Sequence, residues 1–210
     1  MCDFFVKNWT EILKLFVSIW VAIVATSALK TWKRQMTAQK QTEFIDDLSD
    51  SIHRYIDLMS GPTTLVKLIK IQIMAYSKDP TLDPNNENAG IIEFIDKQGE
   101  NQSNTLLKEL KPCIQPVTKI RSLAAKGQIF GFENYEDCQA ACKILGWQYD
   151  QINTLGYIIK KNSMNWDHPE VQSLLKKVNA IKFEEIEERL TNSNLQFLTF
   201  AKKNYTKIYK

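Results

Sequence analysis

A run of uncharged, mostly apolar residues near the N-terminus constrains this chain more than any other feature of its sequence. Residues 15–29, LFVSIWVAIVATSAL, carry no charge, and Lys14 is the single charged residue within residues 12–29. A helix that spans a bilayer needs roughly 17–25 predominantly apolar residues, so this run is just long enough. The sequence therefore predicts a transmembrane helix over residues 12–29.

The residues that flank this run are those expected at a membrane interface. Trp9 and Trp32 lie 23 positions apart. That spacing is about 35 Å along a helix and brackets a hydrocarbon core of about 30 Å. Lys14 and Lys30 are close enough to the two ends to extend their amines towards lipid headgroups.

Two alternatives to a membrane span remain open, although we favour the span. A cleaved signal peptide has an apolar core of this length, and Ala25–Ala28 offers small residues for a cleavage site. Its N-terminal flank should be positive, whereas residues 1–14 are neutral. A buried core helix of a soluble protein is the second alternative. An interfacial helix is excluded because residues 15–29 have no polar face.

Positive charge is concentrated directly after the apolar run. The chain has a net charge of +3, and residues 30–40 alone hold four bases and no acid. These bases are Lys30, Lys33, Arg34 and Lys40. Because Lys and Arg gather on the cytoplasmic side of a span, the C-terminal part is expected in the cytoplasm. This divides the chain into a short N-terminal segment (1–11), the span (12–29), a basic segment (30–40) and a cytoplasmic domain (41–210).

The cytoplasmic domain itself is electrically balanced. Residues 41–210 contain 21 bases and 22 acids, and the whole chain has 23 Lys but only 4 Arg. Nucleic-acid binders need a concentrated basic face, commonly rich in Arg. We therefore expect no nucleic-acid partner.

The rest of the chain reads as an all-α protein, in which the membrane helix continues into a bundle of five or six helices. No Gly or Pro precedes Gly61, so one helix is expected from Trp9 to Met59, ended by Ser60-Gly61-Pro62. Apolar residues recur in it at three- and four-residue spacing, which predicts a face that packs on other helices. They are Phe44, Ile45, Leu48, Ile52, Tyr55, Ile56 and Met59.

Further helices are expected along the C-terminal part. Residues 63–78 favour a second helix over a strand, residues 79–90 a loop, and 91–98 and 104–126 two helices, the latter disturbed by prolines 112 and 116. Asn134 is expected to cap a helix to about Lys161, and Asp167, with Pro169, to cap a last one over 169–203.

Small residues repeat within the predicted span. Ser18, Ala22 and Thr26 lie four residues apart, a spacing that allows helix backbones to approach closely. Small residues are also common in membrane helices in general. We slightly favour this general abundance over a helix-packing face as the reason for the repeat.

Asp46, Asp50, His53 and Asp57 form the best candidate for a metal site, because they share one helix face. This face lies opposite the apolar residues and should be solvated, so we expect neither a bound metal nor another cofactor.

Cys138 and Cys142 also share a helix face. A zinc site needs about four ligands, so we favour a role for both cysteines as small buried residues of the core. No catalytic motif is present, so no catalytic residue is predicted.

The last residues mix aromatic side chains with lysines. Phe197 and Phe200 precede Tyr205 and Tyr209, with four lysines among residues 202–210. Such a segment can lie on an anionic leaflet, or its aromatic residues can pack in the core, as we favour.

These patterns favour a single-pass, membrane-anchored, non-enzymatic module that binds a protein partner or itself. The first alternative is a membrane-active effector, such as a toxin or defence protein, that oligomerises through its transmembrane helix. A metal-dependent enzyme that uses the Asp46–Asp57 face is a minor alternative.

Overall fold

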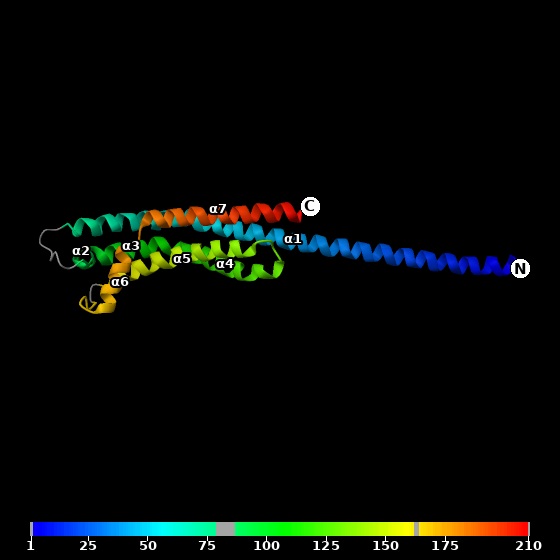
Figure 1. Cartoon of the computed structure of the whole chain (residues 1–210), viewed down its shortest axis with the longest axis horizontal. Coiled ribbons are helices and arrows are strands. Elements are labelled where there is room, and N and C mark those ends of the chain that lie inside the picture. Colours follow the sequence, from blue (N-terminus) through cyan, green and yellow to red (C-terminus); the bar gives the residue numbers. More distant parts are fainter. Residues whose placement is uncertain (1, 79–86, 162–163, 210) are drawn as a thin grey trace.

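The computed structural model describes residues 2–78, 87–161 and 164–209, with the side chains of residues 2–8 and 10 excepted. Within these ranges every regular element is helical and none is a strand, which confirms the all-α prediction. One long helix extends far beyond a bundle formed by the rest of the chain (Figure 1).

The extended helix is α1, Cys2–Tyr76. Its 75 residues correspond to roughly 110 Å. The prediction that it ends at Ser60-Gly61-Pro62 is wrong, because the helix continues through Pro62. Next to the missing proline N–H, the Thr63 hydroxyl donates to the Met59 carbonyl at 2.8 Å. The buried face also continues past the proline through Val66, Ile69 and Ile73, so packing on other helices outweighs the local stop signal.

The second helical layer begins after residues 79–86, where most of the predicted 79–90 loop lies outside the described residues. Helix α2 (Ala89–Phe94), the π-helix η1 (Ile95–Gly99) and α3 (Glu100–Leu110) follow one another without a break. The predicted helix over 104–126 is divided at a 3-10 turn, η2 (Lys111–Cys113), after which α4 runs over Ile114–Lys126. Pro112 lies in that turn and cannot donate a helical hydrogen bond.

A 3-10 turn, η3 (Gly127–Phe130), connects α4 to α5 (Tyr135–Lys160). The helix predicted from Asn134 to about Lys161 is confirmed. Its predicted cap is not formed, because Asn134 has a φ of 55° and its side chain makes no capping hydrogen bond. Asn is among the residues that tolerate this left-handed conformation, so the position turns the chain.

The single last helix predicted over 169–203 is in fact two helices, α6 (Pro169–Asn179) and α7 (Phe183–Ile208). Lys70 of α1 donates to the Val178 and Asn179 carbonyls, so a side chain from another helix binds the end of α6. The cap also differs from the prediction, because the His168 ring, rather than Asp167, accepts a hydrogen bond from the Glu170 N–H at 3.3 Å.

The core is shared by α1, α3, α4, α5 and α7, each of which contributes buried apolar side chains. The predicted apolar face of α1 is confirmed, since six of its seven residues are buried and Ile56 packs against the core. An aromatic cluster closes the end of the bundle where α1 leaves it, with ring centroids 5.1–6.3 Å apart for Phe44 and its neighbours. The cluster consists of Phe44, Phe130, Phe132, Tyr135 and Phe200.

One buried hydroxyl ties α1 to α5. The Tyr55 hydroxyl donates to the Leu145 carbonyl at 2.8 Å in the core. Replacing Tyr55 with Phe should lower the free energy of unfolding by about 1–2 kcal/mol, because the bond is lost and a buried carbonyl loses a partner. Thermal unfolding in mild detergent measures this, with the exposed Tyr157→Phe as the matched control. Equal unfolding temperatures for the two variants would contradict the prediction.

Candidate functional site

The apolar run of α1 is wholly uncovered by the rest of the chain. An 18-residue window of this helix has a mean hydropathy of 2.1, and none of it is buried. Trp20, in its middle, is 70% exposed. The alternative of a core helix of this chain is therefore wrong. Among the described residues, one helix is long and apolar enough to cross a membrane. A signal sequence near an N-terminus can have the same length and composition.

The residues predicted to lie at the membrane interface are found on α1 at the two ends of this run. All of them are exposed: Trp9, Lys14, Lys30, Trp32, Lys33 and Arg34. Lys14 forms an ion pair with Glu11 at 3.3 Å on the N-terminal side. On the C-terminal side, Lys30, Trp32, Lys33 and Arg34 follow within five residues, and no ion pair of these three bases appears in the described part of the chain.

Ser18, Ala22 and Thr26 are exposed on this helix. The Ser18 hydroxyl donates to the Lys14 carbonyl at 2.8 Å, and the Thr26 hydroxyl to the Ala22 carbonyl at 2.7 Å. Both hydroxyls thus have partners within their own helix. They need no second chain for hydrogen bonding.

The acidic face of α1 is exposed at all four of its candidate residues, Asp46, Asp50, His53 and Asp57. Asp46 accepts a hydrogen bond from the Tyr205 hydroxyl of α7. Among the residues whose placement is described, no group of three or more His, Cys, Asp or Glu is arranged to hold a metal ion. Asp46 therefore serves a contact between α1 and α7.

Three cysteines lie in the core as free thiols, Cys113, Cys138 and Cys142. Burial raises the pKa of the Cys113 thiol to about 11. A hydrogen bond with Cys142, together with burial, raises the pKa of Cys138. All three side chains are buried, so they pack as small residues of the core.

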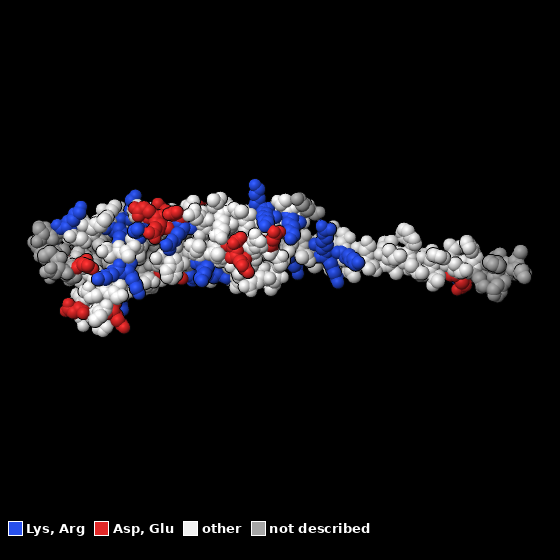
Figure 2. Space-filling model, in the orientation of Figure 1, with Lys and Arg blue, Asp and Glu red and all other residues white. Residues whose placement is uncertain are grey.

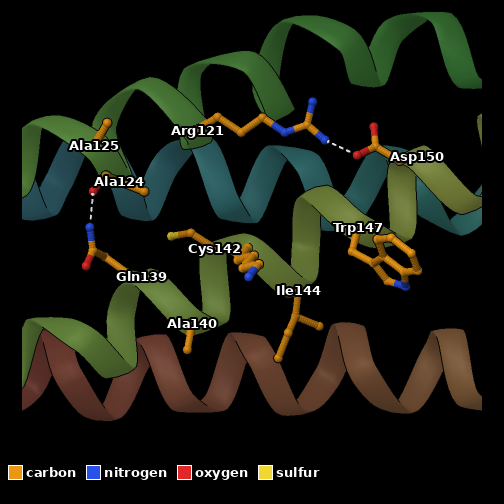
Figure 3. A pocket seen from close by; sticks show the side chains of 10 residues that line it. Arg121, Ala124, Ala125, Gln139, Ala140, Cys142, Ile144, Trp147 and Asp150 are labelled. Carbon is orange, nitrogen blue, oxygen red and sulfur yellow. Dashed lines mark hydrogen bonds and ion pairs between the residues drawn. The ribbon is translucent and has the colours of Figure 1, made fainter.

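A cavity of about 800 Å³ forms an open groove between α4 and α5 (Figure 3). Three of its ten lining residues are alanines, and a hydrogen bond joins α4 to α5 at each end of it. The Arg121 guanidinium donates to the Asp150 carboxylate at 2.7 Å, and the Gln139 amide to the Ala124 carbonyl at 3.1 Å. Its lining comprises Arg121, Ala124, Ala125, Gln139, Ala140, Cys142, Lys143, Ile144, Trp147 and Asp150.

Trp147 is the largest apolar side chain of this groove and is 55% exposed. A large aromatic residue beside an apolar groove is typical of protein interfaces. The sequence prediction missed this surface. The only sequence pattern that points to it is a set of small residues, Ala124, Ala125 and Ala140, followed by Trp147. These residues come together only because α4 and α5 lie side by side in the fold.

Comparison with protein-family models, curated proteins and solved structures finds no match to this chain.

The C-terminal segment buries its phenylalanines in the core and exposes its lysines. Phe197 and Phe200 are buried in the core, as favoured from the sequence. Lys202, Lys203 and Lys207 are exposed, at the end of the bundle from which α1 emerges (Figures 1 and 2). The Lys203 ammonium, at 2.6 Å, hydrogen bonds Glu133 and lowers the pKa of that carboxyl.

Proposed function

We propose that this protein is a single-pass, membrane-anchored interaction module that binds a protein partner through its cytoplasmic helical bundle and carries out no reaction. The observation that supports this proposal is the double role of α1. One uninterrupted helix supplies an apolar window with no buried residue and, from Phe44 onwards, the central helix of the core. The four bases of residues 30–40 support a cytoplasmic bundle.

Membrane anchorage is tested on the full chain expressed in cells. We expect the protein to stay in the membrane pellet after alkaline carbonate extraction and to have the intact mass of the complete chain. The membrane helix is retained in that case, because only an integral segment resists such extraction. A mass that lacks the first 25–30 residues would show a cleaved signal sequence and contradict the proposal.

Partner binding is tested on the groove between α4 and α5. Replacing Trp147 with Ala removes the exposed aromatic side chain and should weaken an interface centred on it by about 2–4 kcal/mol, or roughly 30- to 1000-fold. The measurement is recovery of a partner that is first identified by crosslinking in intact cells and detergent purification. Leu195→Ala is the matched control, because Leu195 of α7 is exposed and apolar but does not line the groove. Equal recovery with both variants would place the interface elsewhere.

A further inference from the structure

A basic cavity lies at the end of the bundle where α1 leaves it. It measures about 390 Å³ and is formed by three segments that are distant in sequence. Helix α1 contributes Lys33 and Arg34, the loop after η3 contributes Gly131 and Phe132, and α7 contributes Lys207. Figure 2 shows Lys and Arg side chains gathered at this junction.

Hydrogen bonds that do not use the cations hold these segments in place. The Gln41 amide of α1 donates to the Phe130 carbonyl at 2.8 Å. Asn204 of α7 binds both backbone groups of Glu133, accepting from its N–H at 3.1 Å and donating to its carbonyl at 3.2 Å. These bonds to the loop after η3 hold the walls of the cavity without using Lys33 or Arg34.

The charges around the cavity are not balanced. Lys33 and Arg34 are exposed, and neither forms an ion pair within the described residues. Lys207 is 3.6 Å from Glu133, but Lys203 is closer to the same carboxylate, at 2.6 Å. Residues 30–40 contain no acid. Three cationic side chains thus line this space, and the nearby Glu133 carboxylate already has a closer partner in Lys203.

The depth of the cavity relative to the apolar run indicates which anion it would meet. Lys33 and Arg34 lie four and five positions past Leu29, or about 6–8 Å farther along the helix. The polar headgroup layer on each side of a bilayer is about 5–8 Å thick. The two cations are therefore at the level of lipid phosphates when residues 12–29 span the membrane.

We propose that this cavity binds the phosphate of an anionic phospholipid headgroup. The planar Arg34 guanidinium suits two oxygens of one phosphate, and the Lys33 and Lys207 ammonium groups neutralise its charge. Because Lys207 belongs to α7, a bound headgroup connects the C-terminal end of the bundle to the membrane. This inference rests on the membrane anchorage proposed above.

The test uses the full chain in mild detergent, titrated with phosphatidylglycerol or phosphatidylcholine, with bound lipids counted by native mass spectrometry. We expect phosphatidylglycerol to half-saturate the protein at a concentration at least about tenfold lower than phosphatidylcholine. The triple variant K33Q/R34Q/K207Q should lose this preference, since each cation near an anionic lipid contributes about fivefold. The control K160Q/K161Q/K177Q removes three exposed cations at the opposite end of the bundle and should keep it.

Two results would overturn the inference. One is that wild-type protein shows no preference for phosphatidylglycerol, or that the triple variant shows the same preference as the wild type. The other is binding of glycerol 1-phosphate as tight as that of the lipid, which would identify a soluble phosphate as the ligand. The single variant R34Q, expected to lose about fivefold, provides the same test should the triple variant unfold at a lower temperature.

Carbonate extraction separates this inference from the proposed anchorage. The triple variant should remain in the membrane pellet, because its apolar run is intact. Wild-type protein in the pellet without a lipid preference refutes the headgroup site alone. Wild-type protein that is extracted from the pellet refutes the anchorage as well.

Discussion

Deletion of residues 1–29 should move the protein from the membrane pellet to the soluble fraction while the bundle stays folded. Eleven large apolar side chains between Ile12 and Leu29 are exposed in the structure. Leaving such side chains in water costs about 1.5–3 kcal/mol each relative to burying them. We therefore expect the full chain to need a bilayer or detergent and the shortened chain to need neither.

The deletion removes no core contact, because Phe44 is the first buried residue of α1 in the described part of the chain. Circular dichroism should show a cooperative thermal transition close to that of the full chain in detergent. A chain in which residues 12–29 are all leucine is the matched control and should stay in the pellet. Recovery of the unmodified full chain in the supernatant without detergent would refute the expectation.

Replacement of Gly99 with Ala should produce a large loss of stability. Gly99 ends η1 and is buried against the end of α5, where an added Cβ would lie 2.2 Å from the Ile159 carbonyl oxygen. That atom belongs to the backbone, so the two helices must separate. We expect the free energy of unfolding to fall by about 2–3 kcal/mol.

Gly61→Ala is the matched control and should change stability in the opposite direction. The site is exposed within α1, and the nearest atom to an added Cβ is Glu109 Oε2 at 3.6 Å, an ordinary contact. Alanine is favoured over glycine in a helix interior by about 0.5–1 kcal/mol, so unfolding should need more free energy. Denaturant unfolding of both variants in detergent measures the two changes. A Gly99→Ala protein as stable as the wild type would show that the contact between η1 and α5 is loose.

Periodicity alone was sufficient to predict the parts of the fold that depend on one face of one helix. The apolar run over residues 12–29 and the buried face of α1 from Phe44 to Met59 were found where the sequence predicted them. In each case the pattern of apolar side chains extends over many turns, so that one misleading residue does not alter the prediction.

The errors occurred where a distant contact decides the local structure. Gly61 and Pro62 resemble a helix end, yet the buried residues on both sides keep α1 continuous. Residues 180–182 contain neither Gly nor Pro, yet the last helix is interrupted there. The carbonyls at that interruption bind Lys70, more than 100 positions earlier, and no local pattern reveals such a partner.

The candidate surfaces were predictable only in part, for the same reason. The bases of residues 30–40 are evident from the sequence, but the arrival of Lys207 beside them depends on how α7 folds back along α1. The groove between α4 and α5 likewise needs the fold, because its two sides come from residues 121–125 and 139–150.

The uninterrupted course of α1 fixes how far from the membrane a partner would be held. Trp147 follows Leu145 by two residues, and the Leu145 carbonyl accepts the hydrogen bond from Tyr55, 26 positions after Leu29. At 1.5 Å for each residue, that level stands about 40 Å above the end of the apolar run. A partner of the groove therefore has to be a soluble protein or to reach this height from its own membrane attachment. Under the proposed function, the continuous helix α1 would act as a spacer as well as an anchor.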